Sequence, residues 1–136
     1  MTCTCCQPLS EAQRMTYPAA LFGPAFAFRV EPTIFTFAQA LSSDYAGGSW
    51  EFYALSNGGF YMAPQSGQLF NVRAENGFEG QLSACALGIT ACLYAYSHLS
   101  FGTAGALTGA CAGQYHLLRE HMLDHREVRS ILAAID

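Results

Sequence analysis

The longest charge-free stretch of the chain constrains its fold more than any other feature. From Gly80 to Leu118 there is no Asp, Glu, Lys or Arg. An uncharged stretch longer than about 18 residues can cross a bilayer or form the core of a globular protein. Five internal glycines and several Ser, Thr and His residues interrupt this stretch, and no cluster of positive charges flanks it. We therefore predict a buried helix followed by a small-residue loop, with no membrane span.

The buried helix is predicted over residues 83–99, where apolar side chains recur at helical spacing. Additional apolar positions widen that face, so the helix is expected to be covered nearly all round. Cys85 and Cys92 are interpreted as small core residues and not as reactive thiols. Residues 101–113 are rich in Gly, Ala and Thr and are predicted to form a flexible connection. Helical spacing resumes over 114–125, and a short final helix is predicted over 127–134.

A β-hairpin is predicted in the middle of the chain. Two aromatic-rich runs, 50–55 and 60–63, are separated by a turn that contains Asn57-Gly58, the dipeptide that favours positive φ in hairpins. A third run, 69–73, follows another turn, so we expect an antiparallel three-stranded meander. Such a small sheet needs a covering layer to be stable.

The remaining segments complete a prediction of one α+β domain. Residues 1–16 show weak periodicity and are predicted to be a flexible tail, with the domain spanning 17–136. A helix is predicted from Glu31-Pro32 to Gly47-Gly48, because Pro is tolerated in a first turn and Gly favours a helix end. At 136 residues the chain suits a single domain. The expected fold is the three-stranded meander packed with about four helices.

The charge balance excludes two ways of acting on DNA. The chain carries ten carboxylates and six basic residues, for a net charge of -4. No basic stripe is available to neutralise phosphates, so direct nucleic-acid binding is not expected. A DNA mimic would need about 20 negative charges per ten base pairs imitated, which ten carboxylates do not supply.

The cysteines and histidines form two groups that could carry chemistry. The N-terminal group Cys3, Cys5 and Cys6 has no second cysteine knuckle, and no secretory segment precedes it, so we expect reduced thiols in the cytoplasm. A second group, His116, His121 and His125, supports an alternative interpretation as a small metal-binding or Cys/His-dependent enzyme. The Glu that a zincin needs after the first His is absent here. We therefore predict no cofactor, no metal and no catalytic residue.

The block from Asp44 to Pro64 (DYAGGSWEFYALSNGGFYMAP) resembles the ArdB/KlcA antirestriction family. The resemblance continues through 76–84 and 115–119 to the terminal Ala-Ile-Asp, and covers roughly residues 19–136. It is weakest over 101–113.

The resemblance implies a protein of plasmids or other mobile elements that protects incoming DNA from type I restriction. The expected partner is the type I restriction complex or an associated host factor, met through a protein surface. Aromatic residues alternate along the strands, so either one set faces outward for recognition or helices cover both faces of the sheet. The candidate surface residues are Asp44, Tyr45, Trp50, Tyr53, Asn57, Tyr61 and Asp136.

Overall fold

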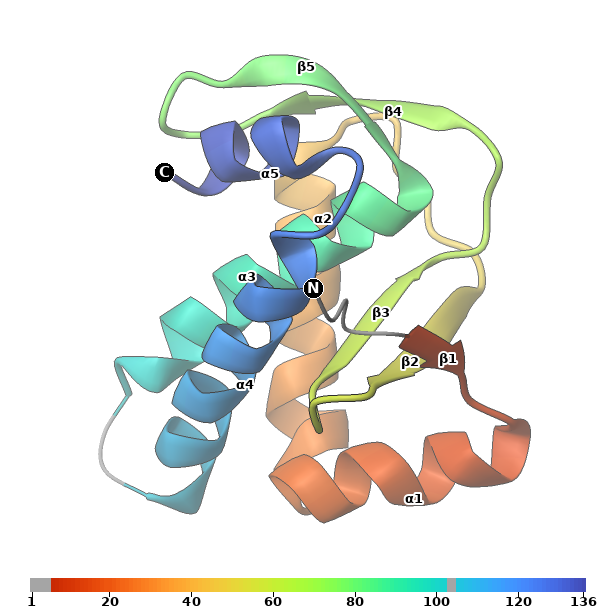
Figure 1. Ribbon diagram of the computed structural model, residues 1–136, viewed down its shortest axis with the longest axis vertical. Coiled ribbons are helices and arrows are strands. Elements are labelled where there is room, and N and C mark those ends of the chain that lie inside the picture. The colour runs from red at the N-terminus through yellow and green to blue at the C-terminus, as the bar shows by residue number, and fades with distance from the viewer. Residues whose placement is uncertain (1–5, 103–104) are drawn as a thin grey trace.

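A computed structural model describes residues 6–102 and 105–136, which form five α-helices, one π-helix and five strands (Figure 1). The helices are α1 Glu11–Phe22, the π-helix η1 Phe26–Val30, α2 Glu31–Leu41, α3 Ala84–Ser100, α4 Ala106–Met122 and α5 Val128–Ile135. The strands are β1 Cys6–Pro8, β2 Trp50–Leu55, β3 Phe60–Pro64, β4 Leu69–Arg73 and β5 Glu79–Ser83. The α+β class is confirmed. Within the described residues, no helix has the length and apolar character needed to span a membrane.

The predicted hairpin is present as β2 and β3, which pair antiparallel with Tyr53 opposite Tyr61. Its turn is closed by backbone hydrogen bonds between Leu55 and Gly59 and between Gly58 and Leu55. Gly58 has a φ of 92°, a conformation that glycine adopts without steric cost. Asn57 supports the turn by accepting a hydrogen bond from the Gly59 N–H at 2.9 Å.

The third strand of the sheet is not the one predicted. The three-stranded sheet has the order β1-β2-β3, so its third member is the N-terminal strand and not residues 69–73. Those residues form β4, which pairs with β5 in a separate two-stranded sheet. The turn between β4 and β5 contains Asn76-Gly77, and Gly77 has a φ of 96°. This tight turn places residues 79–83 beside β4 and away from the first sheet.

The N-terminal segment also differs from the expected tail. Residues 6–8 pair with β2, and α1 starts at Glu11, directly after its cap residue Ser10. Ser10 and Gln13 form a capping box, in which each side chain accepts a hydrogen bond from the backbone N–H of the other. This arrangement satisfies two backbone donors at the start of a helix. Residues 1–5 of the predicted tail lie outside the described residues.

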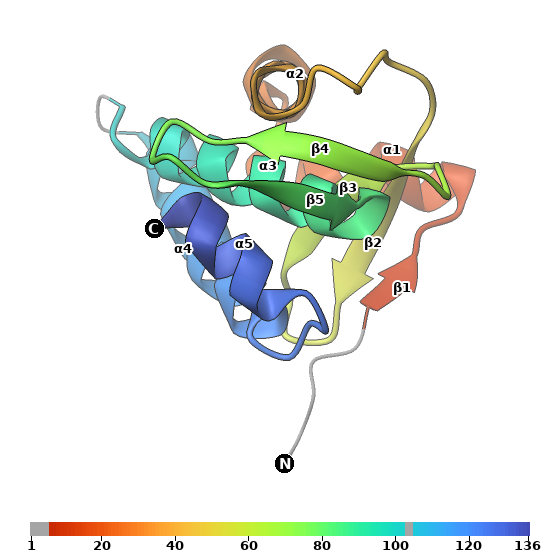
Figure 2. The ribbon, with the colours of Figure 1, turned by 90° about the horizontal axis from the view of Figure 1, so that it is seen from above.

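The central helix α3 packs against most other elements and closely matches the predicted buried helix. Figure 2 shows β4 and β5 lying over α3, with α2 on one side and α5 on the other. Gly88 permits close contact with β3, since a Cβ there would overlap the Met62 carbonyl oxygen and Ala63. The predicted loop over 101–113 is shorter than expected, because α4 already begins at Ala106. The helix predicted to reach Gly47 ends at Leu41.

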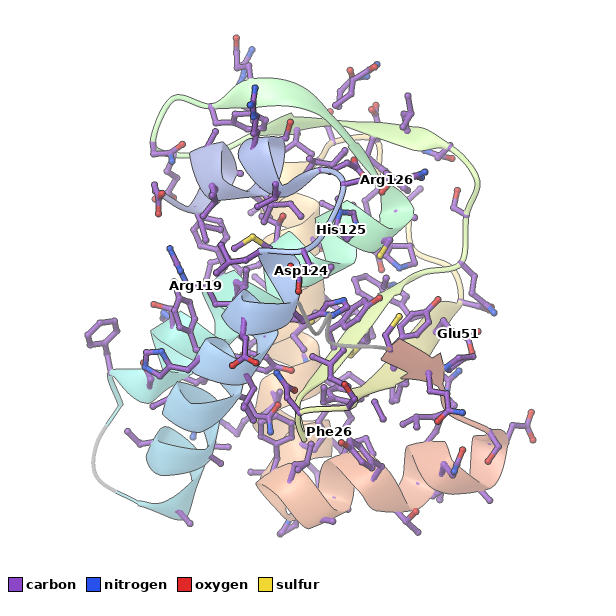
Figure 3. The ribbon with its side chains drawn as sticks, viewed as in Figure 1. Phe26, Glu51, Arg119, Asp124, His125 and Arg126 are labelled. Carbon is purple, nitrogen blue, oxygen red and sulfur yellow. The ribbon has the colours of Figure 1, made fainter. Side chains whose placement is uncertain are left out.

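Side chains cover both faces of the three-stranded sheet, which decides between the two interpretations of its aromatic residues. On one face, the Phe26 ring of η1 packs edge-on against Phe52 and Phe60 (Figure 3). On the other face, Tyr61 stacks with Tyr53 and with His121 of α4. The aromatic strand residues are therefore mainly core residues.

Candidate functional site

Asp44 is the predicted surface residue that lies at the centre of an exposed polar network. The Asp44 carboxylate accepts hydrogen bonds from the backbone N–H and the side-chain amide of Asn71, at 2.8 and 2.9 Å. The side-chain amide oxygen of Asn71 accepts a further hydrogen bond of 3.2 Å from the Gln81 side-chain amide. These three side chains are exposed and join the loop after α2 to β4 and β5.

The network borders an open hollow of about 760 Å³ between α2 and the β4–β5 sheet. Arg73 and Glu79 form an ion pair of 2.7 Å at its edge, and both side chains remain mostly exposed. Exposed ion pairs of this kind contribute little to stability. Because these side chains are exposed, the hollow offers hydrogen-bonding groups and charges that a protein partner can contact. Its lining residues are Gln39, Ala40, Leu41, Ser43, Asn71, Val72, Arg73, Glu79, Gly80 and Gln81.

Tyr45 and Trp50 serve mainly to hold the chain between α2 and β2. The Trp50 indole N–H donates to the Tyr45 hydroxyl at 2.9 Å, and the two rings meet edge to face. Trp50 is only 4% exposed and also packs against Phe35. Burial removes Trp50 from the predicted interaction surface, whereas Tyr45 remains partly accessible.

Tyr61 is likewise buried, at 1% exposure, and lies at the centre of a thiol–tyrosine cluster formed by Cys6, Tyr61 and Cys85. Its ring stacks on Tyr53 at a centroid distance of 4.8 Å. Burial raises the pKa of Tyr61 far above its usual range, and the neighbouring Cys85 thiol adds to the effect. Tyr61 thus stays a neutral hydrogen-bonding group, and Tyr53 is the half-exposed member of the stacked pair.

Asn57 and Asp136 lie apart from these groups. The Asn57 amide donates to the Leu117 carbonyl oxygen of α4 at 2.9 Å, which ties the hairpin turn to that helix. Asp136 is exposed at the end of α5. The seven predicted residues therefore do not form one patch, and Asp44, Tyr45, Tyr53, Asn57 and Asp136 are those with accessible side chains.

Asn71 and Gln81 are surface residues that the sequence prediction missed. The alternating pattern of residues 69–73 already placed Asn71 on the side opposite Phe70 and Val72. The pairing of Asn71 with Gln81 depends on β5, which the prediction did not contain.

The three histidines considered for metal binding have other contacts. His121 stacks with Tyr61, His116 meets Tyr115 edge to face, and His125 Nδ1 accepts a hydrogen bond from the Glu127 N–H at 3.0 Å. In Figure 3, His125 lies in the turn after α4, between Asp124 and Arg126. Across residues 6–102 and 105–136, no group of three or more His, Cys, Asp or Glu side chains is placed to hold a metal ion. The arrangement does not favour the metal or Cys/His enzyme alternative.

Residues 43–136, which contain the Asp44 network and the β4–β5 side of the hollow, match the family model described as antirestriction protein. The chain belongs to the antirestriction protein family. Two relatives from Escherichia coli, each described as antirestriction protein KlcA, are 38% and 40% identical to it. The first alignment covers 94% of this chain and 92% of the relative, and the second covers 94% and 90%.

The family likeness extends to the three-dimensional fold. A solved structure from work on the KlcA and ArdB proteins superposes with a TM-score of 0.90 at 36% identity. The match covers 98% of this chain and 95% of that one. KlcA and ArdB are described there as showing a novel fold and antirestriction activity against type I DNA restriction systems in vivo but not in vitro. The N-terminal elements β1 and α1, which precede the family-model match, are thus included in the structural likeness.

Proposed function

We propose that this protein relieves restriction of incoming DNA by type I restriction systems. The observation that carries the proposal is the family match, together with a fold shared with the KlcA and ArdB proteins over nearly the whole chain. Antirestriction activity against type I systems is described for those proteins. Sequence identities of 38% and 40% over 94% of the chain support transfer of that role to this protein.

The proposed mode of action is contact through a protein surface, without catalysis and without imitation of DNA. The charge balance of the chain supports this mode, since a net charge of -4 falls far short of the charge density of a duplex. The metal alternative has no candidate ligand group in the described part of the chain. The proposed partner is the type I restriction complex or an associated host factor.

The difference between activity in vivo and in vitro, described for the KlcA and ArdB proteins, favours a partner that is missing from purified reactions. Activity in vivo but not in vitro is the result expected when inhibition needs a cellular component besides the restriction enzyme and DNA. We assign the contact on this chain to the exposed network of Asp44, Asn71 and Gln81. These polar side chains border an open hollow and lie within the family-matched residues.

A plating experiment tests the activity. Unmodified phage is plated on a host with an active type I system, with and without this gene, and on a matched host that carries a type II enzyme. Expression should restore plating on the type I host and leave the type II host unchanged. Unaltered plating on the type I host, with the protein present in the cells, would contradict the proposal.

Two variants test the surface. Gln81→Arg places a long cation at the edge of the hollow, and repulsion or steric conflict of about 1.4 kcal/mol would weaken partner binding about tenfold. Ala12→Arg adds the same charge at an exposed position of α1 and serves as the matched control. Loss of antirestriction in Gln81→Arg alone supports the assigned surface, whereas equal activity of both variants at equal expression would refute it.

A further inference from the structure

Two cysteine sulfurs from distant parts of the chain contact the same buried hydroxyl group. The Tyr61 hydroxyl donates to Cys6 Sγ at 3.8 Å and lies 3.3 Å from Cys85 Sγ. The two sulfur atoms are therefore no further apart than the sum of these distances. Cys6 belongs to β1 and Cys85 to the first turn of α3, so the hydroxyl links the N-terminal strand to the central helix.

The two thiols differ in their access to solvent. Cys6 is exposed and Cys85 is half-buried, while Cys92 and Cys111 are buried. A reagent in solution can thus reach Cys6 first among the four cysteines that the structure describes. Burial raises the pKa of the Cys85 thiol, and the hydrogen bond between Cys85 and Tyr61 opposes this effect. Cys85 is therefore slow to react with a reagent in solution. Because both sulfurs contact the Tyr61 hydroxyl, Cys85 is placed to react second, with a sulfur already activated on Cys6.

The local structure allows the remaining movement. A disulfide needs a sulfur–sulfur distance of about 2.05 Å, so the Tyr61 hydroxyl must leave the space between the two sulfurs. Strand β1 has three residues, all exposed, and pairs with the sheet on one side only. A short edge strand opens at low cost in free energy, because few buried contacts and hydrogen bonds hold it. We therefore expect Cys6, and not Cys85, to move when the two sulfurs approach each other.

We propose that Cys6 and Cys85 are an oxidation site, at which hydrogen peroxide converts the two thiols into a reversible disulfide that fastens β1 to α3. The Cys6 sulfur attacks one peroxide oxygen, an S–O bond forms and the O–O bond breaks, and the second oxygen takes up the Cys6 thiol proton and leaves as water. The Cys85 sulfur then attacks the Cys6 sulfur, the S–S bond forms and the S–O bond breaks. The departing oxygen takes up the Cys85 proton and leaves as a second water. Two thiols are oxidised and one peroxide is reduced.

Peptide mapping of the full chain tests the proposal directly. All six basic residues are Arg, so trypsin yields one peptide of residues 1–14, which contains Cys6, and one of residues 74–119, which contains Cys85. After treatment with hydrogen peroxide and blocking of free thiols, the two peptides should appear as one linked species. Fragmentation of this species should assign the bond to Cys6 and Cys85, and a reducing agent should separate the peptides.

Other cysteines in the same peptides provide the controls. The double variant Cys3→Ser/Cys5→Ser and the single variant Cys111→Ser should keep the linked species, while Cys6→Ser and Cys85→Ser should lose it. Cys6→Ser changes an exposed residue, so its result does not depend on the tolerance of the core. Closure of this long loop should also raise Tm of the oxidised protein by roughly 5–15 °C relative to the reduced protein.

Three results would overturn the proposal. They are a linked species that persists in Cys6→Ser, a bond that fragmentation assigns to another cysteine pair, and absence of linkage in the wild-type chain under conditions that oxidise exposed thiols.

Discussion

The Glu127 carboxylate holds the N-terminal end of α3 through Ser83. Its two oxygens accept hydrogen bonds from the Ser83 N–H at 2.9 Å and from the Ser83 hydroxyl at 2.5 Å. The Ser83 oxygen in turn accepts a bond from the Ala86 N–H, as the cap of α3. A carboxylate at this end also interacts favourably with the helix dipole. The turn between α4 and α5 is thereby joined to the start of the central helix.

Removal of this carboxylate should destabilise the protein. Glu127→Ala leaves the Ser83 N–H without its acceptor, and we expect a loss of about 1–3 kcal/mol in the free energy of unfolding. Urea denaturation followed by circular dichroism measures the change. Glu120→Ala removes an exposed carboxylate from α4 and should alter stability by less than about 0.5 kcal/mol. Equal effects of the two substitutions would contradict the capping role of Glu127.

The stability of the protein should fall as mildly acidic pH protonates His125. Burial lowers the pKa of His125 below its ordinary value of 6.5, so the unfolded chain binds this proton more readily than the folded protein. The contribution is complete above pH of about 6.5 and declines as pH falls from there towards the folded pKa. Protonation also removes the Nδ1 lone pair that accepts the Glu127 N–H.

His125→Asn isolates this titration, because the asparagine oxygen can replace Nδ1 as an acceptor but does not ionise in this range. We expect a weaker dependence of unfolding free energy on pH as the pH falls below about 6.5. His116→Asn, at an exposed position of α4, is the control and should retain the wild-type dependence. An unchanged pH profile in His125→Asn would rule out this assignment.

Gly88 and Gly113 should respond oppositely to the same substitution. At Gly88 a Cβ would lie 2.5 Å from Ala63 Cα and would also overlap the Met62 carbonyl oxygen, so Gly88→Ala must push α3 away from β3. We expect a loss of about 3 kcal/mol or more. Nothing lies within 4 Å of the corresponding Cβ at Gly113, and Gly113→Ala in α4 should stabilise by about 0.5–1 kcal/mol. Denaturant midpoints of the two variants measure these changes in stability. A Gly88→Ala variant as stable as the wild-type protein would show that α3 and β3 can move apart at no cost in free energy.

Native protein should protect Cys92 and Cys111 from thiol reagents. Both side chains are fully buried, and burial raises the pKa of Cys92 to about 12 and that of Cys111 to about 11. Only a small fraction of either thiol is ionised at neutral pH, and the thiolate is the reactive form. Reaction with an aromatic disulfide followed by mass spectrometry should label Cys6 in the native state and these two only after denaturation. Fast labelling of Cys92 without unfolding would contradict the packing of α3.

The local elements of this fold could be predicted from sequence, and the pairings between distant segments could not. Asn57-Gly58 predicted the β2–β3 hairpin because the dipeptide itself favours the required turn. The apolar pattern of residues 83–99 predicted α3 because almost every side of that helix is buried. In contrast, β5 has one buried residue in five and includes Gly80, so it lacks a clear strand pattern. The pairing of β4 with β5 therefore escaped prediction.

The N-terminal elements were missed for a different reason. Three residues of β1 are too few to display any period, and Pro18 inside α1 argues against a helix. The Ser10 to Gln13 spacing was the available signal, since it is typical of a capping box. At the candidate site, alternation along β2 and β3 could not distinguish an exposed aromatic face from a covered one. Tyr61 and Trp50 are buried by segments remote in sequence.

The burial of α3 divides the molecule into a central helix and the outer elements that surround it. Helix α3 touches α2, α4, α5 and both sheets, and its own surface is almost wholly occupied by them. The surface left for a partner is then that of the outer elements, of which α2, α4 and α5 each pack directly against α3. Changes in distant, non-contacting parts generally combine additively. Substitutions in one outer element can therefore alter its contact with a partner protein while the remaining elements keep their positions.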